Sequence, residues 1–511
     1  MLIEWQTRDM KDWQADAIIF FSFEKSEEPL PGFKRWMEGS APWISGSQAL
    51  QDFKGKHQEV AVYYGPADCE IPRLIAVGLG PADKFELDKL RSAAAGAFRK
   101  CRELQISRPA LPLAAFEGLP LDRATALRES LIGGICGLYR YDALKTRDVD
   151  AYTSLETLLL LHDAAPDDTL RAVPIEADAV ASGISFARDL VNAPANRVTP
   201  TLLADSARRL AEDHGFHIQV LSYEMAQILG MEAFTAVARG SREPAWVIIL
   251  EHRPPGTEND APFVFIGKGI TFDTGGISIK PSANMEAMKQ DMAGAASVLG
   301  AFDILGKLKV PRRVVAILPC TENMPDGKAY KPGDVIRSLA GLTIEVISTD
   351  AEGRMILCDA LAYSLRLEPA LIVDMATLTG ACLIALGKEV AGLMGNHEGL
   401  TRKIQDLGRE VGEKFWPLPL WDFYFDYIKS EAADFKNVGD RTAGTIIGGI
   451  FLKQFVPDKI PWAHLDIAGT AWTDKDLGVA PKGATGFGVR LLVELAQRGF
   501  ETSGNQGLKS Q

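Results

Sequence analysis

Short apolar runs alternate with segments of helical periodicity along this chain of 511 residues, and that alternation limits the possible folds more than any other feature. In the first third of the chain, four runs have the length and composition of buried strands: 17–23, 60–65, 74–80 and 155–162. Segments 83–105 and 122–145 carry apolar residues at helical spacing. Strands that alternate with helices form a largely parallel sheet covered by helices, so we expect an α/β domain.

The rest of the chain repeats this pattern on a larger scale. It begins with a predicted helix at 175–191 and a second helix opened by Thr199 and Pro200, a capping residue followed by a first-turn proline. Six further strands are predicted: 246–251, 263–267, 314–318, 343–347, 371–374 and 464–467. Several of them run directly into Gly, Asp or Ser, and ligands of open α/β sheets bind beyond the carboxyl ends of strands. We therefore expect the chemistry in this second domain.

The domain organisation follows from these segments. Residues 1–165 are predicted to form a smaller N-terminal α/β domain with a role in assembly or regulation. Two prolines and several acidic residues mark 166–174 as a solvent-exposed linker. Residues 175–500 are expected to form a larger catalytic domain with a central mixed sheet flanked by helices, and 501–511 a polar tail.

Composition excludes several classes of protein. Hydrophobic residues make up 47% and charged residues 24% of the chain, as in globular rather than disordered proteins. The uncharged stretch 375–387 is too short for a bilayer crossing, which needs ~20 apolar residues. Residues 1–16 mix both charge signs without an apolar core, unlike a secretory signal. We expect a cytoplasmic protein with no membrane segment.

Cysteine usage and net charge narrow the field further. The six cysteines are scattered without a CxxC pair, so we expect reduced core residues rather than disulfides or a zinc knuckle. Lys and Arg total 55 against 67 Asp and Glu, a formal charge of −12. This balance works against nucleic acid or an anionic membrane as a partner of the whole molecule, although a local basic patch stays open.

A glycine-rich turn that carries charge follows the predicted strand at 263–266. It spans 267–276, continues to Lys280, and contains Lys268 and Asp273. The GxxxxGK[ST] order of a Walker loop is absent, and Phe272 stands where the third glycine of a GxGxxG fingerprint would be. Nucleotide binding is therefore disfavoured at this turn.

A helix predicted at 286–305 places a carboxylate beside its buried face. Its apolar stripe steps by four and three residues: Met288, Met292, Ala295, Leu299 and Phe302. Asp291 lies on the flank of that stripe. Because burial of an unpaired charge costs several kcal/mol, Asp291 should be neutralised by a proton, a basic side chain or a metal.

The third segment, 348–354, reads Ser-Thr-Asp-Ala-Glu-Gly-Arg after the predicted strand 343–347. In an extended chain, side chains at every second position share a side, which would bring Asp350, Glu352 and Arg354 together. Two carboxylates so close repel each other unless a cation lies between them. A divalent metal is the natural interpretation.

Together the segments offer four carboxylates, Asp273, Asp291, Asp350 and Glu352, whereas the seven histidines show no HExxH or HxH spacing. Oxygen-rich ligands can hold two divalent ions about 3.5–4 Å apart and activate a water for hydrolysis. Each residue taken alone has a plainer explanation as a cap, a turn former or an ion pair. The same holds for residues outside the cluster: Asp374 as a turn cap, Asp359 as a solvent-facing helix residue and His464 as a structural histidine.

At these residues the sequence resembles the leucyl aminopeptidase family of dimetal exopeptidases, also called the cytosol aminopeptidase family. The likeness covers most of 186–497 and rests on four blocks: 267–281, 349–354, 374–381 and 464–469. The N-terminal third resembles the smaller α/β domain of that family in its general layout. Ser348 replaces the usual Asn and Met355 a usual Leu, from which we expect altered positioning at most.

The resemblance implies a role for each matching residue. The implied ligands of two divalent ions per subunit, Mn²⁺ or Zn²⁺, are Lys268, Asp273, Asp291, Asp350 and Glu352, with Asp273 and Glu352 shared or nearly shared. Lys268 must then be neutral, through a pKa that the two ions depress. Lys280 would stabilise the oxyanion, an effect often worth ~3–4 kcal/mol. Arg354 would hold a bicarbonate that serves as general base. The implied wall of the side-chain pocket is Met288, Thr377, Gly380 and Ala468.

The implied function is a metal-dependent aminopeptidase that releases N-terminal residues, leucine-like ones preferred, from peptides through a water activated by two metals. The family forms homohexamers, which we expect here. Two alternatives stay open. A dimetal phosphohydrolase could use a similar site, although no phosphate-gripping Arg cluster is evident. A DNA-binding role, known among relatives of the family, is opposed by the acidic balance.

Overall fold

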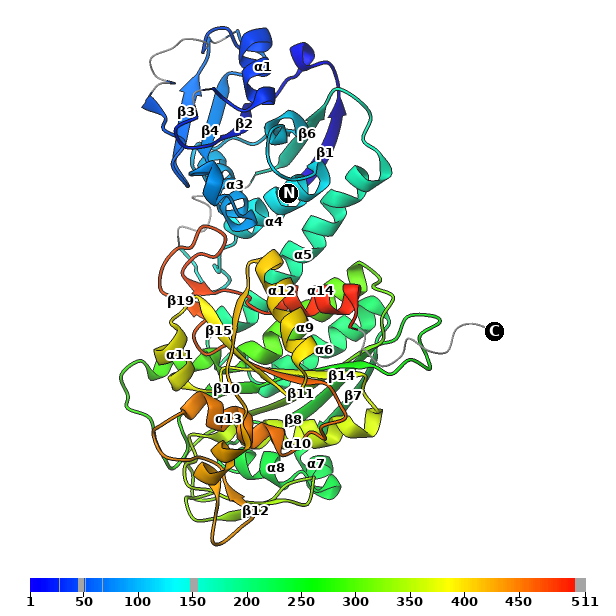
Figure 1. The fold of residues 1–511 in the computed structure, drawn as a ribbon, viewed down its shortest axis with the longest axis vertical. Coiled ribbons are helices and arrows are strands. Elements are labelled where there is room, and N and C mark those ends of the chain that lie inside the picture. The colour runs from blue at the N-terminus through cyan, green and yellow to red at the C-terminus, as the bar shows by residue number, and fades with distance from the viewer. Residues whose placement is uncertain (27, 45–49, 51, 67, 148–154, 501–511) are drawn as a thin grey trace. The chain divides into compact units, whose positions relative to one another are not determined.

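The chain folds into two compact α/β units, each built on its own sheet. The computed structural model describes residues 1–500 except 27, 45–49, 51, 67 and 148–154, so the predicted tail at 501–511 lies outside the described residues. The smaller unit comprises Met1–Ala181 and Lys475–Lys482, and the larger unit begins at Ser182. The larger unit also includes the chain from Gly483 onward. Two α/β units with helix-flanked mixed sheets confirm the predicted fold class (Figure 1).

The smaller unit holds a sheet in the order β1-β6-β5-β2-β4-β3, parallel throughout except for β3. Its strands are β1 (Leu2–Thr7), β2 (Ala17–Ser22), β3 (Val60–Tyr64), β4 (Arg73–Gly78), β5 (Pro109–Pro112) and β6 (Thr157–His162). Its described helices are α1 (Pro31–Ser40), α3 (Leu87–Glu103) and α4 (Arg123–Gly137), with 3₁₀ turns η1 (Met10–Asp12), η2 (Ala82–Lys84) and η3 (Leu113–Phe116). Every residue of β2 is buried, and Phe20 stacks on Phe33 of α1 with ring centroids 4.8 Å apart.

The four strands predicted for this unit are β2, β3, β4 and β6, whereas β1 and β5 were not predicted. Strand β5 is only four residues long and contains two prolines, Pro109 and Pro112, which argue against a strand in sequence. Strand β1 lies at the sheet edge and leaves several side chains exposed, so it lacks a continuous apolar run. Tertiary pairing with β6 supplies what the local pattern does not show.

The larger unit is built on a nine-stranded mixed sheet. Its path is β16-β15-β18-β14-β9-β11-β8-β7, and β10 pairs with β11. The strands of this sheet are β7 (His217–Ser222), β8 (Trp246–His252), β9 (Phe263–Gly267), β10 (Gly269–Asp273), β11 (Val314–Asn323), β14 (Leu371–Ala376), β15 (Val390–Gly395), β16 (Lys414–Pro417) and β18 (Trp462–Asp466). Smaller sheets contain β12 (Val335–Arg337), β13 (Thr343–Glu345), β17 (Phe435–Lys436), β19 (Trp472–Thr473) and β20 (Gly483–Ala484).

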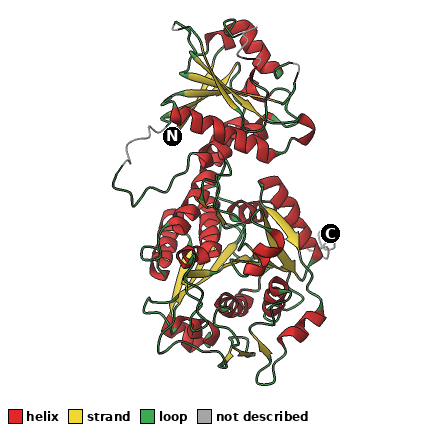
Figure 2. Ribbon diagram, turned by 90° about the vertical axis from the view of Figure 1, so that its left-hand side faces the viewer, coloured by secondary structure: helices red, strands yellow, loops and turns green. Residues whose placement is uncertain are grey.

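Helices cover both faces of this sheet (Figure 1). Helices α6 and α9, with α12 and α14, lie on one face, and α8, α10 and α13 lie on the other. The bounds are α5 (Asp168–Asn192), α6 (Pro200–His214), α7 (Tyr223–Leu229), α8 (Glu232–Ala238), α9 (Ala293–Lys307), α10 (Glu352–Ser364), α11 (Gly380–Leu386), α12 (Glu398–Val411), α13 (Gly444–Lys453) and α14 (Val489–Arg498). The 3₁₀ segments are η4 (Met285–Met292), η5 (Leu365–Leu367) and η6 (Asp422–Ile428). The strands of the two large sheets lie between helices in the turned view as well (Figure 2).

The linker predicted at 166–174 is wrong, because most of it belongs to helix α5. The side chain of Asp167 accepts a hydrogen bond from the amide of Leu170 at 2.8 Å, which caps this helix at its start. Pro174 lies inside the helix, where it removes one backbone hydrogen bond. The good helix formers on either side outweigh that loss. The division between the two units falls within α5, after Ala181.

The glycine-rich turn predicted at 267–276 is largely a strand. β9 pairs with the first half of β11, and β10 pairs with the second half. The same edge of β11 is therefore paired with two successive strands, which are separated by a break at Lys268. Gly267 is required before this break because a Cβ there would come within 2.6 Å of the backbone of Ala295. The break turns the Lys268 backbone to Met375 of β14, whose carbonyl accepts the Lys268 amide at 3.0 Å.

The helix predicted at 286–305 begins later than expected. Residues Met285–Met292 form the 3₁₀ segment η4, and the α-helix α9 starts at Ala293. The amide of Ala295 donates to the carbonyl of Lys268 at 3.0 Å, so the start of α9 is fixed by the break between β9 and β10 rather than by local periodicity. Asp291 is buried, as predicted, although it lies in η4.

Two smaller sequence predictions were also tested. All six cysteines are free; five of them are buried as predicted for core residues, whereas Cys69 is half-buried. In the described part of the chain, none of the helices combines the length and apolar character required to cross a bilayer.

Asp359 of α10 was predicted to face solvent, and this is wrong. Its side chain is fully buried and accepts the backbone amides of Phe234 at 2.9 Å and Leu339 at 2.8 Å. Phe234 lies in the first turn of α8, whose N-cap residue Met231 makes no side-chain cap. Asp359 therefore caps α8 from a different helix, which local sequence could not indicate.

Removal of this long-range cap should destabilise the larger unit. Asp359→Ala leaves the buried amide of Phe234 and the partly buried amide of Leu339 without acceptors, at about 1–3 kcal/mol each, so the free energy of unfolding should fall by about 2–6 kcal/mol in urea titrations. Asp406→Ala, at an exposed position of α12, is the control and should change it by less than about 0.5 kcal/mol. Equal stability of the two variants would contradict the capping role.

The same site should make stability depend on pH. Burial raises the pKa of Asp359 to about 7, although backbone amides at Leu339 and Phe234 act in the opposite direction. Because the folded-state pKa exceeds the unfolded value, its contribution is complete below about pH 4 and is lost as the pH rises through about 7. Asp359→Asn, which does not ionise, should therefore gain stability relative to wild type from pH 4 to pH 7.

Candidate active site

Side chains from four separate segments meet beyond the ends of the central strands. Asp273 is the last residue of β10, and Lys268 lies in the break between β9 and β10. Asp291 comes from η4, and Glu352 is the first residue of α10. Residues that lie at the ends of neighbouring strands converge at one edge of an α/β sheet, which is where such folds bind ligands.

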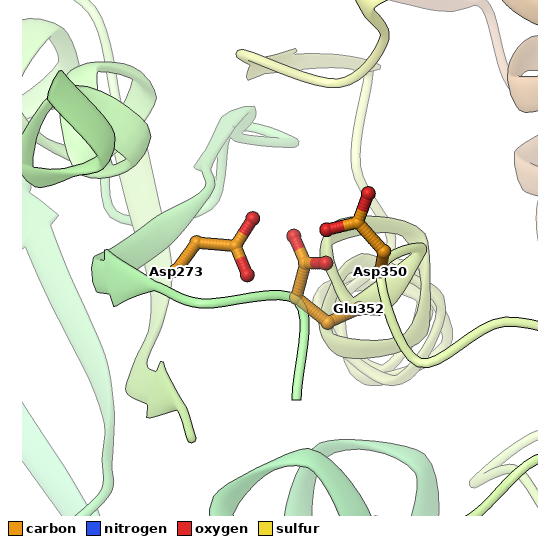
Figure 3. Close-up of side chains that lie close together, drawn as sticks. All are labelled: Asp273, Asp350 and Glu352. Carbon is orange, nitrogen blue, oxygen red and sulfur yellow. The ribbon is translucent and has the colours of Figure 1, made fainter. Parts of the chain in front are cut away.

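Three carboxylates face one another at the centre of the site. Asp273, Asp350 and Glu352 each offer an oxygen within 4.8 Å of the other two. Figure 3 shows the Asp273 carboxylate directed toward those of Glu352 and Asp350. Asp273 and Glu352 are each only 2% exposed, whereas Asp350 is open to solvent. The site is therefore a buried acidic cluster with one accessible side.

Two lysines each bridge a pair of these carboxylates. The Lys268 ammonium lies 2.7 Å from Asp291 Oδ2 and 2.8 Å from Glu352 Oε1. The Lys280 ammonium lies 2.8 Å from Asp273 Oδ2 and also pairs with Asp350. Four carboxylates thus share two ammonium groups, so the cluster retains an excess of negative charge.

Burial and mutual repulsion shift the pKa values of the carboxylates. Burial, together with Glu352, raises the pKa of Asp273 to about 6. Burial also raises the pKa of Asp291 well above its usual value and, to a smaller extent, that of Asp350. Only the pKa of Glu352 is lowered, because Lys268 and Lys280 together outweigh its burial. Three of the four carboxylates therefore resist ionisation, and additional positive charge would stabilise their ionised form.

The lysines are held in their charged form by the same contacts. Burial alone would lower the pKa of Lys268, but Asp291, Glu352 and Asp273 outweigh it and raise the pKa. The pKa of Lys280 is raised in the same way, chiefly by Asp273. The lowered pKa expected for Lys268 thus depends on divalent cations whose repulsion exceeds the attraction of the carboxylates.

The donor set fits divalent cations. Two ammonium groups, each between two carboxylates, mark two positions where this cluster accommodates positive charge. Carboxylate oxygens suit Mn²⁺ and Mg²⁺, and Zn²⁺ accepts a mixture of oxygen and nitrogen ligands. Four carboxylates and one amine could satisfy two such ions, with open positions left for water and substrate.

Segment 348–354 converges by a different geometry from the one predicted. It is not extended, because α10 begins at Glu352, and Asp350 lies in the turn before it. Thr349 fixes this turn: its hydroxyl donates to the Gly275 carbonyl at 2.6 Å, and its amide donates to Ser278 Oγ at 3.1 Å. The two carboxylates meet because the turn and the first residue of the helix face the same side.

Arg354 lies in the first turn of α10 and is 6% exposed. Its Nη1 donates to the carbonyl of Asn437 at 2.8 Å. Burial lowers its pKa to about 10, although Glu352 and Asp466 act in the opposite direction. The guanidinium therefore stays charged at neutral pH, beside the acidic cluster.

The four residues predicted for the pocket wall have different surroundings. The Thr377 hydroxyl donates to Asp291 Oδ1 at 2.6 Å, and its carbonyl accepts Lys268 at 3.1 Å, so Thr377 contacts the acidic cluster itself. Met288 in η4 and Ala468 after β18 are half-buried. Gly380 begins α11 and has open space where a Cβ would stand. Their role in substrate binding stays a prediction.

Sequence reasoning missed Asn323, the last residue of β11. Its Nδ2 donates to Asp273 Oδ1 at 2.8 Å, to the Thr349 carbonyl at 3.0 Å and to Glu352 Oε2 at 3.4 Å. This fully buried amide orients two of the central carboxylates. The available signal was the change from apolar residues to Thr-Glu-Asn at 321–323, at the end of a buried strand.

Two buried polar residues join the neighbouring strands β14 and β18. His464 Nδ1 lies 2.5 Å from Asp374 Oδ1, and both side chains are fully buried. The indole of Trp462 donates to Asp374 Oδ2 at 2.6 Å. His464 is therefore the structural histidine that was predicted, whereas Asp374 joins two strands instead of capping a turn.

Known proteins of similar sequence were found for both units. The model of the cytosol aminopeptidase family, catalytic domain, matches residues 185–493, and that of the family's N-terminal domain matches residues 19–148. A curated relative named "Probable cytosol aminopeptidase" from Syntrophobacter fumaroxidans (strain DSM 10017 / MPOB) is 59% identical over 496 residues, which cover 97% of this chain and 98% of the relative. One of the same name from Nitratidesulfovibrio vulgaris is 47% identical over 507 residues, 98% of this chain and 99% of the relative.

Solved structures show the same similarity. The bottromycin maturation enzyme BotP in complex with Mn is 35% identical, with a TM-score of 0.83 over 95% of this chain and 99% of that chain. A mutant of tomato leucine aminopeptidase is 32% identical, with a TM-score of 0.87 over 98% of this chain and 97% of that chain.

The acidic, lysine-containing cluster at the strand ends of an α/β fold, together with the family match, identifies a metal-dependent hydrolase of peptides. The chain belongs to the cytosol aminopeptidase family, and it is a metal-dependent aminopeptidase. The family match also covers the smaller unit, where sequence reasoning found a likeness of layout only.

Proposed function

We propose that the acidic cluster binds two divalent metal ions and that the enzyme removes N-terminal residues, leucine-like ones preferred, from peptides. The observation that carries this proposal is the pair of lysines, each of which bridges two carboxylates. The shortage of positive charge and the raised pKa values of Asp273 and Asp291 support it, because additional cations would relieve the repulsion while the carboxylates stay ionised. The ions, when bound, supply Lewis-acid activation of a water for attack on the peptide carbonyl.

The ligand set that we propose is the one predicted from the sequence: Lys268, Asp273, Asp291, Asp350 and Glu352. Asp273 and Glu352 occupy the centre of the cluster and are the candidates to be shared between both ions. Asn323 keeps the two carboxylates oriented through its amide hydrogen bonds, and Thr377 does the same for Asp291. Such outer contacts govern how well ligands are arranged for a metal.

Lys280 and Arg354 are the proposed catalytic residues. Lys280 is partly accessible at the open side of the cluster, where its ammonium can donate to a substrate carbonyl and to the oxyanion that develops from it. Arg354 is charged and buried, and its Nε has no hydrogen-bond partner in the described part of the chain. We propose that Arg354 would hold a bicarbonate ion, which would supply a general base for the reaction.

The identity of the metals and the preferred residue are also proposals. Manganese is supported by the similar structure of BotP in complex with Mn, and zinc by the mixed oxygen and amine donors. The similarity to a leucine aminopeptidase supports a preference for leucine-like residues. Four residues are the proposed wall of the pocket that would receive such a side chain: Met288, Thr377, Gly380 and Ala468.

The assembly of the enzyme and its location in the cell are proposals as well. A homohexamer is supported by large apolar side chains that the single chain leaves exposed, among them Trp416, Trp421 and Phe423. A role of the smaller unit in assembly or regulation is proposed because the ligand set lies entirely in the larger unit. Cytoplasmic location is supported by the name of the curated relatives, cytosol aminopeptidase.

The function is tested by release of p-nitroaniline from leucine p-nitroanilide. The purified enzyme should hydrolyse this substrate, lose the activity when a chelator removes its metal, and regain it with Mn²⁺ or Zn²⁺. N-acetyl-leucine p-nitroanilide, which lacks a free amino group, is the control and should not be hydrolysed. Full activity after verified metal removal would end the proposal of a dimetal site.

Lys280→Ala should separate catalysis from metal binding. Loss of one oxyanion donor typically lowers kcat by about 10²–10³-fold, and we expect a loss in this range with metal content retained. Lys100→Ala, which removes a surface lysine paired with Glu103 in the smaller unit, is the matched control and should retain activity. Kinetics and elemental analysis of both variants provide the measurement, and unchanged turnover of Lys280→Ala would remove Lys280 from the mechanism.

A further inference from the structure

Asn437 is a fully buried polar residue that no sequence motif indicated. It follows directly after β17, which pairs in parallel with β13 through Ile344–Phe435 and Glu345–Lys436. The Asn437 amide donates to the carbonyl of Glu345 at 2.9 Å. The backbone hydrogen bonds between the two strands therefore end at Asn437. Beyond β13, the neighbouring segment enters the turn that carries Asp350.

The side chain of Asn437 takes over where the backbone ladder stops. Its Oδ1 accepts the amides of Ile347 at 2.8 Å and Ser348 at 3.3 Å, and its Nδ2 donates to the Ser348 carbonyl at 2.7 Å. One side-chain amide thus binds both the donors and the acceptor of a two-residue stretch. Ser348 lies two residues before Asp350, so these contacts fix the direction from which the chain approaches the acidic cluster.

The backbone of Asn437 holds a second functional residue. Its carbonyl accepts Nη1 of Arg354 at 2.8 Å, a hydrogen bond that orients a buried guanidinium. Since Nε of Arg354 is without a partner among the described residues, this contact has a large share in fixing the orientation of the group. Asn437 therefore holds both the turn that carries Asp350, through its side chain, and Arg354, through its carbonyl.

The chain that follows Asn437 is only partly buried. Val438, Gly439 and Asp440, together with Ile347, line a cavity of about 560 Å³. Val438 and Gly439 are half-exposed, and Asp440 is exposed. The hydrogen bonds of the fully buried Asn437 thus anchor a segment whose next residues border open space.

We propose that Asn437 is a positioning residue that sets Asp350 and Arg354 in register with the acidic cluster. This inference rests on the proposed roles of those two residues. The site requires an amide, because Asp would lose the donor to Ser348, Leu would lose all three side-chain hydrogen bonds, and Gln would extend too far. Removal of the amide should therefore disturb the reaction more than the stability of the fold.

The test compares Asn437→Ala and Asn437→Asp with Asn396→Ala in the full-length enzyme. Asn396 makes a comparable pair of bridges: its Nδ2 donates to the Ile460 carbonyl at 2.9 Å, and its Oδ1 accepts the Trp462 amide at 2.8 Å. These contacts lie at the start of β18, whereas the active site lies beyond the ends of the strands. Each variant is measured for unfolding temperature, kcat and KM on leucine p-nitroanilide, and the Mn²⁺ concentration that half-restores activity.

We expect Asn437→Ala to lower kcat by about 10–100-fold and to raise the half-restoring Mn²⁺ concentration, with KM changed by less than about threefold. Asn437→Asp keeps the oxygen that accepts the amides of Ile347 and Ser348, so its kcat should lie between those of Asn437→Ala and wild type. Asn396→Ala should lose a similar amount of stability and keep kcat. If Asn437→Ala does not fold, Asn437→Asp alone is compared with the control.

Two results would overturn the positioning role. One is a folded Asn437 variant whose kcat and Mn²⁺ requirement match those of Asn396→Ala. The other is a loss of kcat that merely follows the loss of stability in both asparagine variants. The wild-type enzyme is assayed with and without chelator in the same series, so wild-type activity that survives metal removal would count against the dimetal site itself and not against Asn437.

Discussion

Repulsion between carboxylates in a poorly solvated site is the constraint on which the rest of this structure depends. Asp273, Asp291 and Glu352 are buried, and with Asp350 they form a cluster in which two lysines supply too little positive charge to balance four acids. Such an arrangement is tolerable if the carboxylates share cations or if some of them bind a proton. Burial and this repulsion raise the pKa values of Asp273 and Asp291, and the same property supports the proposed binding of divalent ions.

The residues of this cluster lie where regular strands and helices are interrupted. The break between β9 and β10 places Lys268 opposite η4, where Asp291 lies. The turn before α10 then directs Asp350 and Glu352 toward Asp273. Two buried side-chain amides complete the arrangement. Asn323 donates a hydrogen bond to the Asp273 carboxylate, and Asn437 binds the backbone just before the turn that carries Asp350. Irregular backbone at strand ends is thus the means by which a rigid sheet holds a charged site.

Much of this could be predicted from the sequence, because buried strands that end in acidic residues leave a local signal. Asp273, Asp350 and Glu352 were expected to meet, and they do. The extended geometry assigned to 348–354 was wrong, since the start of α10 is fixed by contacts from Thr349 to another segment. Asn323, Asn437 and Asp359 bind groups of segments far away in sequence, and hydrophobic periodicity does not indicate such contacts. The helix across the predicted linker was missed because prolines in sequence suggest a break that a good cap can override.

Diffraction from crystals grown with Mn²⁺, recorded at the manganese absorption edge, tests the central claim most directly. We predict two anomalous peaks per subunit among the oxygens of Asp273, Asp291, Asp350 and Glu352, about 3.5–4 Å apart, with Lys268 turned from ion pair to ligand. We also predict that Lys280 no longer bridges Asp273 and Asp350. Crystals that bind manganese elsewhere, or that leave both lysines in their ion pairs with no peak between the carboxylates, would contradict the claim.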